Sequence, residues 1–278
     1  MSIRIHHLNC GTMCPLCDRL MNNQDGQIFK KGKLVCHCLL IEAPDGLILV
    51  DTGLGTHDID QPRKRLGLAY PPIFQPRLDY QETALHQIQQ LGFKASDVRH
   101  IALTHVDLDH AGGLSDFPQA QVHIFKPELE QLLNPGFREK NRFRPIQFDH
   151  QPNWVVHEER GENWFGFSSI RAIPGLSSDI LLIPLVGHTR GHTGVAIKQG
   201  ERWLLHCGDA YYHHSQVTEN PRVPFGSMMF QKGIASLRSE RVRNLQRLRE
   251  LAFNHADEVS LFSSHDPVEF DRYAAPSR

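Results

Sequence analysis

Apolar residues recur along the chain in short runs with two different periods, and these runs predict strands alternating with helices. The predicted strands are rich in Val, Ile and Leu and are bounded by polar or turn-forming residues. They cover residues 34–42, 47–50, 100–104, 121–125, 180–185, 194–198, 203–206 and 259–262. Ala43-Pro44-Asp45-Gly46 joins the first two in a compact turn, so we expect a hairpin that ends at Asp51.

Three segments have the apolar spacing of a helix. The first runs from Asp79 to Leu91 and stops at Gly92, and the second opens at Pro127. The inner side of the second is predicted to carry Leu129, Leu132 and Leu133. The third is a long amphipathic helix over about 234–256. Its buried face is predicted to carry Leu237, Val242, Leu245, Leu248 and Ala252.

Composition indicates one ordinary globular domain. The chain has 278 residues, 40% hydrophobic and 22% charged, and no repeat, low-complexity tract or linker divides it, so we expect a single domain over 1–278. The formal net charge of -1 argues against a nucleic-acid partner or an anionic membrane surface. The start lacks the apolar region of a secretory signal, which predicts a cytoplasmic protein.

The six cysteines do not form a strong motif. Cys14-Pro-Leu-Cys17, with Cys10 nearby, could hold a structural zinc ion or form a redox pair, but a single CxxC favours reduced structural thiols. Cys36 and Cys38 fall on one face of a predicted strand and are expected to be buried, and Cys207 is expected to serve packing.

Residues 104–113 carry the most informative chemistry. Two imidazoles and two carboxylates, from His105, Asp107, Asp109 and His110, precede a pair of glycines. Imidazole and carboxylate groups are ligands for zinc, iron and manganese, and four of them in one loop can serve two ions. The loop is therefore predicted to be a metal site.

Three later motifs also follow apolar strands and carry a potential ligand. They are Gly187-His188 with His192, Gly208-Asp209, and Ser264-His265-Asp266. Loops at strand ends are the usual place for chemistry on a rigid sheet scaffold. His192 is expected to be a packed structural residue rather than a ligand.

The ordered set of Asp51-Thr-Gly, THxxxDHxGG, GHTxGHT, Gly-Asp and a late histidine resembles the metallo-beta-lactamase superfamily over about residues 30–270. The resemblance implies an α+β fold, a four-layer αββα sandwich, with a dinuclear metal site. It places one ion on His105, Asp107 and His188, and the other on Asp109, His110 and His265. Asp209 would bridge the two ions, and Asp51 would support the ligand loop without binding metal.

Within that superfamily, Asp209-Ala-Tyr-Tyr212 is similar to a motif of the N-acyl-homoserine lactonases. Val223-Pro-Phe225 and the stretch leading into Asp51 also resemble that branch. The resemblance implies a lactone or ester hydrolase, associated with quorum quenching, in which Tyr212 polarises the lactone carbonyl. A core aromatic role for Tyr212 stays open.

Asp107 departs from the family pattern, because most members carry the second histidine of HxHxDH there. A carboxylate makes the first site harder and more negative, which favours iron or manganese more than an all-imidazole site does. The flavodiiron branch has Glu at this position and binds iron. Zinc remains the first expectation for the two divalent ions, with iron or manganese as alternatives at the Asp107 site.

The implied mechanism has a hydroxide between the ions attack an acyl carbon, while Asp109 moves a proton to the leaving oxygen. The substrate would be a small molecule, and a homodimer is possible. Alternatives are hydrolysis of thioesters, phosphoesters or beta-lactams, an iron redox protein, or a binding protein without catalysis. His213 and His214 are expected at the surface, and His6 and His7 on a solvated strand.

Overall fold

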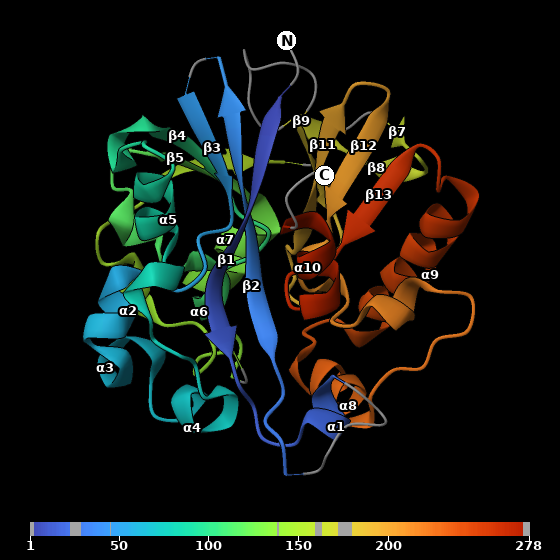
Figure 1. Cartoon of the computed structure of the whole chain (residues 1–278), viewed down its shortest axis with the longest axis horizontal. Helices are drawn as coiled ribbons and strands as arrows, with labels where there is room; N and C mark the ends of the chain where they lie inside the picture. The colour runs from blue at the N-terminus through green and yellow to red at the C-terminus, as the bar shows by residue number, and fades with distance from the viewer. Residues whose placement is uncertain are drawn as a thin grey trace.

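The computed structural model describes residues 3–22, 29–44, 46–137, 139–158, 163–171 and 180–274. Asp45 of the predicted hairpin turn lies outside these ranges. Within them, the chain forms two larger sheets that face each other, with helices on the outer side of each (Figure 1).

The first sheet is built from the N-terminal half of the chain. Its strands follow sequence order, with β1, β2 and β3 antiparallel and β3 to β6 parallel. Their bounds are β1 Arg4–Met13, β2 Leu34–Ala43, β3 Gly46–Val50, β4 Val98–Ala102, β5 Gln121–Phe125 and β6 Asn153–His157. The carboxyl ends of the parallel strands meet at one edge, where their loops can build a common site.

The second sheet comes from the C-terminal half and has the order β13-β12-β11-β10-β9. Only the β12–β13 pair is parallel. The bounds are β9 Ile170–Arg171, β10 Ile180–Pro184, β11 Thr193–Gln199, β12 Arg202–His206 and β13 Val259–Phe262. A small separate hairpin pairs β7 Asn163–Trp164 with β8 Phe167–Ser168.

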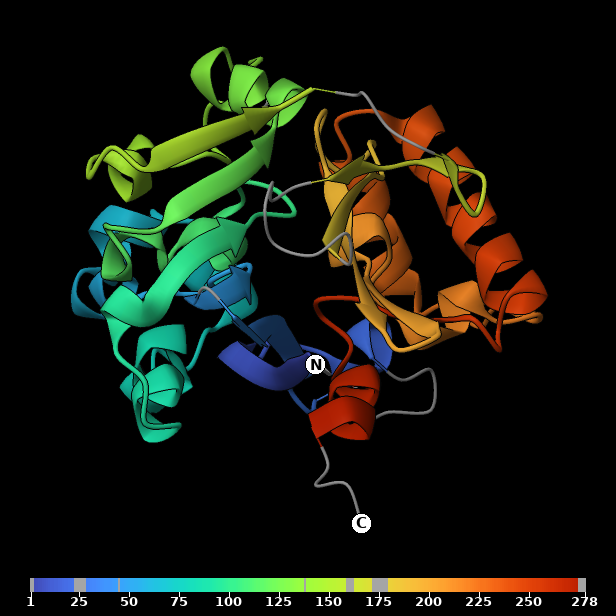
Figure 2. The same cartoon turned by 90° about the horizontal axis from the view of Figure 1, so that it is seen from above.

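Helices cover the outer faces, as Figure 2 shows, with α5 on the side of the first sheet and α9 on the side of the second. The helices are α1 Asp18–Met21, α2 Thr56–Asp60, α3 Pro62–Leu66, α4 Tyr70–Phe74, α5 Ala84–Gln90, α6 Leu108–Ala111, α7 Lys126–Leu133, α8 Phe225–Ile234, α9 Arg238–Asn254 and α10 Pro267–Ala274. This layering confirms the predicted α+β fold and the αββα sandwich.

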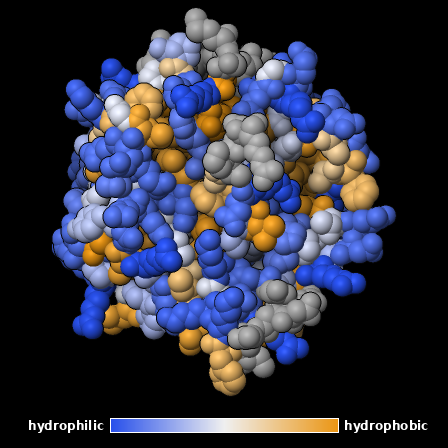
Figure 3. Space-filling view, in the orientation of Figure 1, coloured by the Kyte–Doolittle hydropathy of each residue, from blue (hydrophilic) through white to orange (hydrophobic). Residues whose placement is uncertain are grey.

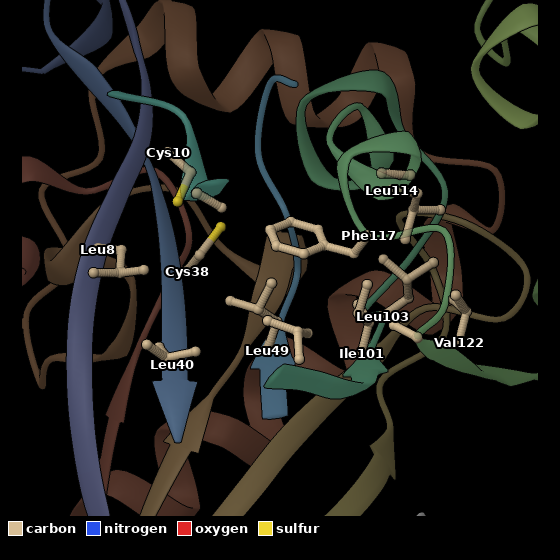
Figure 4. Close-up of a cluster of buried hydrophobic side chains, with 14 of the residues drawn as sticks. Leu8, Cys10, Cys38, Leu40, Leu49, Ile101, Leu103, Leu114, Phe117 and Val122 are labelled. Carbon is tan, nitrogen blue, oxygen red and sulfur yellow. The ribbon is translucent and has the colours of Figure 1, made fainter. Parts of the chain in front are cut away.

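The core follows from the alternation of side chains along each strand. On β2, Leu39 and Ile41 face the second sheet, where they pack against Leu182 and Val195. Cys38 and Leu40, one position out of phase, pack under the helices on the other face. Figure 4 shows that outer cluster, in which Phe117 joins side chains of the first sheet.

Most predicted strands are confirmed to within two residues at each end, but the helix boundaries are less accurate. The helix predicted from Asp79 begins only at Ala84, because the Thr83 hydroxyl accepts a hydrogen bond from the His86 amide and caps it there. A short 3₁₀ turn over Tyr80–Glu82 precedes it.

The helix predicted over 234–256 is in fact two helices. The α8 helix ends at Ile234 and α9 starts at Arg238, with a non-helical link between them. Within α9 the predicted inner position Val242 is 56% exposed, whereas Leu248 and Leu251 are buried. The prediction that Leu133 lies on the inner side of α7 is also wrong, since this residue is 68% exposed.

The N-terminal strand β1 carries two further corrections. His6 and His7 are half-buried rather than solvated. His6 hydrogen-bonds Glu42 at 2.6 Å, and His7 hydrogen-bonds His37 at 2.8 Å. Burial, followed by the nearby His206, lowers the pKa of His7 to about 4, so its ring is neutral at physiological pH.

All six cysteines are free thiols, and Cys36, Cys38 and Cys207 are buried as predicted. In the described part of the chain, neither Cys14 nor Cys17 joins a group of three or more potential metal ligands. Within the same residue ranges, no helix has the length and apolar character needed to cross a membrane. The face in Figure 3 is mainly hydrophilic, with hydrophobic residues in small scattered groups. The homodimer stays a prediction.

Candidate metal centre

The predicted ligand loop lies where the first sheet meets the second. Strand β4 ends at Ala102, and the loop then leads into the short α6, for which Asp107 is the N-cap residue. Gly112 closes this turn at close quarters, because a Cβ there would meet the Asp58 Oδ2 atom at 2.2 Å and the Leu108 carbonyl at 2.5 Å. The glycine pair after the histidines therefore serves packing of the loop.

The structure brings all seven predicted ligands together in two overlapping groups. We call His105, Asp107 and His188 the first half of the centre, and Asp109, His110 and His265 the second half. Asp209 lies between the two halves.

The first half is a tight group around one carboxylate oxygen. The Nε2 atoms of His188 and His105 lie 2.9 Å and 3.2 Å from Asp107 Oδ2. Burial, followed by the neighbouring His110, lowers the pKa of His105 to about 3, so its ring is neutral and able to donate a lone pair. The donor set suits a divalent ion by its chemistry.

A basic side chain also enters the first half, which the sequence did not reveal. Arg142 donates from Nε to Asp107 Oδ1 at 2.6 Å and from Nη2 to Asp107 Oδ2 at 2.5 Å. Burial alone would raise the pKa of Asp107, but the Arg142 guanidinium outweighs it and holds the pKa well below its usual range. The expectation that Asp107 leaves the first half more negative is therefore wrong, because Arg142 balances its charge.

The second half is built from Asp109 and His110 of α6 and from His265, which follows β13. His110 and His265 approach each other with their Nε2 atoms 3.3 Å apart, and both face Asp209 Oδ1, at 3.3 Å and 3.1 Å. Asp109 Oδ2 lies 3.7 Å from His265 Nε2. No guanidinium or ammonium group contacts these three side chains in the described residues.

Asp209 faces both halves, as the bridging prediction requires. Its Oδ2 atom lies 3.3 Å from His188 Nε2 and 3.8 Å from His105 Nε2, while Oδ1 faces the second half. Burial would raise the pKa of this carboxyl, yet His265, His110 and His188 hold it well below its usual range. Asp209 is therefore ionised at neutral pH.

Two groups hold the ligands in place from behind. Asp51 accepts hydrogen bonds from the Thr104 amide at 2.8 Å, from the Thr104 hydroxyl at 2.7 Å and from His110 Nδ1 at 2.8 Å. These contacts fit the supporting role predicted for Asp51, since they fix the orientation of His110. Glu128 ties two ligand loops together by accepting from the amides of Val106 and Gly191.

His192 is buried and hydrogen-bonded on both ring nitrogens, which confirms the structural role predicted for it. Its Nδ1 lies 3.1 Å from the Leu185 carbonyl, and its Nε2 accepts from the Asp209 amide at 2.9 Å. Gly208 makes this possible: its φ is +54°, and a Cβ would lie 2.5 Å from the His192 ring. The turn therefore fixes the backbone of Asp209.

Unsatisfied polar atoms test whether the centre fits metal ions. His105 Nε2 and Asp209 Oδ1 are buried in the core of the centre, and neither has a hydrogen-bond partner. Buried polar groups without partners are uncommon and costly, so such atoms indicate that the residues fit a cation. Each half has one of them, because His105 Nε2 belongs to the first half and Asp209 Oδ1 faces the second, but the first half already holds a guanidinium.

A cavity of about 820 Å³ opens onto the centre, lined in part by Asp107, Asp109, Asp209 and Tyr212. Its wall includes residues from two segments, 63–74 and 139–144. These include Arg63, Leu66, Leu68, Tyr70, Ile73 and Phe74 from the first segment, and Glu139, Asn141, Arg142 and Arg144 from the second. Phe230 and Ile234 of α8 complete the apolar side.

Tyr212 lies at the junction of the cavity and the centre. Its hydroxyl donates to Asp209 Oδ2 at 2.5 Å, and its ring stacks on His265 with centroids 5.2 Å apart. The ring is buried, but the residue lines the cavity, so it is not only a core aromatic.

Sequence reasoning missed several residues around the centre. Arg142 and Glu128 gave no signal, because neither belongs to a recognisable motif. Cys36 was assigned to packing, yet it forms a group of potential ligands with Asp109 and His265.

His213 and His214 are half-buried rather than surface residues, which corrects the prediction. His214 Nδ1 hydrogen-bonds Asp266 Oδ2 at 2.8 Å, and His213 contacts Ser215 and the Asn22 carbonyl. Both ring nitrogens of His213 and the Nδ1 atom of His214 have partners in the loops beside His265, so these histidines support the loops.

Comparison with known proteins agrees with the geometry. The profile of the metallo-beta-lactamase superfamily matches residues 32–251. A probable metallo-hydrolase of Mycobacterium tuberculosis is 41% identical over 266 residues, 95% of this chain and 81% of that protein. An N-acyl homoserine lactonase of Rhizobium radiobacter is 24% identical over 268 residues, 95% of this chain and 94% of that protein.

Solved structures show the same fold. An N-acyl homoserine lactone hydrolase with N-hexanoyl-L-homoserine at its catalytic metal centre aligns with a TM-score of 0.72 at 21% identity, covering 98% of this chain and 97% of that one. A dizinc quorum-quenching lactonase aligns with a TM-score of 0.66 at 18% identity, covering 95% and 88%.

Proposed function

The chain belongs to the metallo-beta-lactamase superfamily, and we propose that it is a metal-dependent hydrolase that opens a lactone, with carboxylic esters as the nearest alternative substrates. The relatives support the coarser part of this statement, a metal-dependent hydrolase. The lactone is proposed on the similarity to N-acyl homoserine lactonases and on the groups that face the cavity.

The observation that carries the proposal is the contact between Tyr212 and Asp209 at the cavity wall. The Tyr212 hydroxyl donates to Asp209 Oδ2 at 2.5 Å. A phenol in this position is a hydrogen-bond donor at the edge of the metal centre, where the carbonyl oxygen of an acyl substrate would develop negative charge. Burial, followed by the charge of Asp209, raises the pKa of Tyr212 well above its usual range, so the hydroxyl keeps its proton at neutral pH.

Divalent ions bound to the two halves would supply a hydroxide nucleophile at neutral pH and polarise the acyl carbonyl. Asp209 orients Tyr212 through their hydrogen bond. Tyr212 turns its hydroxyl to the substrate oxygen as charge develops there. Asp109 lines the cavity with its side chain 13% exposed, and we assign to it the transfer of the proton from the nucleophile to the leaving oxygen.

The cavity wall is consistent with an acylated lactone. Its volume of about 820 Å³ falls within the range of small-molecule sites. Leu66, Leu68 and Ile73 lie on one side, and Phe74 and Phe230 contact each other with ring centroids 5.4 Å apart. Such a surface would bury an aliphatic acyl chain, while the polar head group lies at the metal centre.

A substrate panel tests this function. The purified protein is stripped of metal, reloaded separately with zinc, manganese or iron(II), and assayed on acyl-homoserine lactones of several chain lengths, simple lactones, aryl esters, thioesters and phosphotriesters. We expect metal-dependent opening of lactones, with kcat/KM rising with acyl chain length. Preference for thioesters or phosphotriesters would keep the hydrolase and reject the lactone. No turnover with any metal would reject the enzyme.

A further inference from the structure

We infer that the guanidinium of Arg142 occupies the cation position in the first half of the centre, and that a metal ion enters the first half only by displacing it. The inference rests on the proposed function for one premise, that this cluster binds metal. It adds that the two halves have unequal affinities for metal ions, and that Arg142 causes the lower affinity of the first half.

All the hydrogen-bond donors of the Arg142 guanidinium have partners. A guanidinium offers five N–H donors in a rigid fork. Beyond the two bonds to Asp107, Nη2 lies 2.6 Å from His188 Nε2, while Nη1 donates to the carbonyls of Ile234 at 2.9 Å and His188 at 3.2 Å. The group is therefore seated in a built pocket rather than placed loosely in the cavity.

The atoms that bind this guanidinium are also the atoms that would bind a metal ion in the first half. Both Asp107 oxygens and the Nε2 atom of His188 face Arg142. A ring nitrogen such as His188 Nε2 has one lone pair, so it cannot accept an N–H bond and coordinate an ion at the same time. The fork on a carboxylate is also among the stronger hydrogen-bonded arrangements, because both partners are charged and the two bonds are parallel.

Burial makes the pair persistent. The side chain of Arg142 is 11% exposed and that of Asp107 is 9% exposed. Solvent therefore screens the pair little, and removing one member would leave the other charge unpaired in the interior. An incoming ion must break this pair and move a charged side chain toward the cavity, and its apparent affinity for the first half falls accordingly.

The second half has no such competitor. Among the described residues, the partners of His110 and His265 are other ligands, the supporting Asp51 and a backbone carbonyl. Asp209 Oδ1 also faces this half. The first ion to bind should therefore take the second half, and a further ion should bind more weakly.

Zinc titration of the metal-free protein against a competing chromophoric chelator measures both affinities without any substrate. For the unaltered protein we expect one tight ion and a second ion weaker by about tenfold or more. Arg142→Gln should tighten the binding of the weaker zinc ion, in the first half, by about tenfold. It should leave the affinity of the tighter ion, in the second half, nearly unchanged. Arg142→Lys keeps a charge but cannot form the fork, and it should fall between the two.

Arg144→Gln is the matched control, because Arg144 lines the same cavity but donates to the Lys64 carbonyl and not to Asp107. It should leave both zinc affinities unchanged. Far-UV circular dichroism checks that each variant folds. If Arg142→Gln does not fold, the zinc affinities of Arg142→Lys test the inference instead.

The sign of the change separates this inference from its alternative. If Arg142 only holds Asp107 in place for the metal, its replacement should weaken zinc binding by about 10–100-fold, as loss of an outer support does. Weaker or unchanged binding of the second ion would therefore overturn the inference while leaving a metallohydrolase intact. If the unaltered protein bound none of zinc, manganese and iron(II), the proposed function would instead be rejected.

Discussion

The two halves of the centre have similar ligands but different surroundings. In the second half, His110 and His265 face the Asp209 carboxylate, and the supporting contact comes from Asp51 on the far side of His110. In the first half, a carboxylate at 107 has recruited the Arg142 guanidinium. A carboxylate in place of a histidine at 107 therefore alters more than the metal preference of the first half. It can form an ion pair with a basic side chain of the protein, which then competes with the metal ion.

Removing the carboxylate that both halves share should have the largest effect. Asp209→Ala removes a carboxylate that faces ligands of both halves, so zinc content should fall and hydrolysis should drop by roughly a thousandfold. Elemental analysis and lactone turnover measure these two quantities on one preparation. Retained turnover with full metal content would show that Asp209 does not join the halves.

Tyr212→Phe should lower kcat for a lactone by about a hundredfold while zinc content in both halves stays unchanged. The substitution removes a hydroxyl that contacts Asp209 but is not itself among the predicted ligands. Parallel metal analysis and steady-state kinetics separate the two effects. Full activity of the variant would keep the hydrolase but discard the role of Tyr212.

Asp107→His should make the two halves more alike. The variant removes the partner of the Arg142 fork and supplies a neutral ligand, so the second zinc ion should bind about tenfold more tightly. Adding Arg142→Gln to it should bring little further gain, because both changes remove the same ion pair. Independent, additive gains would mean that Arg142 acts on the metal by another route.

Glu269 provides a smaller test, of the support behind the second half. Its carboxylate accepts from the Ser263 amide at 2.8 Å and from the Tyr211 hydroxyl at 2.9 Å, near the strand end that carries His265. Burial, followed by the charge of Asp266, raises the pKa of Glu269 from 4.5 to about 7.

The folded state therefore binds a proton more tightly than the unfolded state, and its stability falls as pH rises from 4.5 to about 7. The loss reaches up to about 3 kcal/mol. Glu269→Gln should flatten this part of the profile, as urea unfolding of the metal-free protein at several pH values would show. An unchanged slope would remove Glu269 as its source.

The fold and the ligand set could be predicted because both leave local marks in the sequence. Apolar runs located the strands, and the ligands lie in short motifs directly after strands. The start of α5 at Ala84 and the break between α8 and α9 were missed, because a capping threonine and a non-helical link do not interrupt the apolar period. Arg142 was missed for another reason.

Arg142 and its partner Asp107 come from segments that are distant in the sequence, and only the tertiary structure brings them together. A motif records which residues stand near one another in the chain, whereas a salt bridge between segments depends on how loops fold over a cavity. The oddity of Asp107 was visible in the sequence, but the side chain that compensates it was not.

Anomalous diffraction from crystals of the unaltered protein, grown with about one equivalent of zinc, tests the difference between the halves most directly. The account predicts one strong zinc peak among His110, Asp209 and His265, with Arg142 still on Asp107. Equal peaks in both halves, or a single peak between Asp107 and His188 with Arg142 displaced, would contradict it.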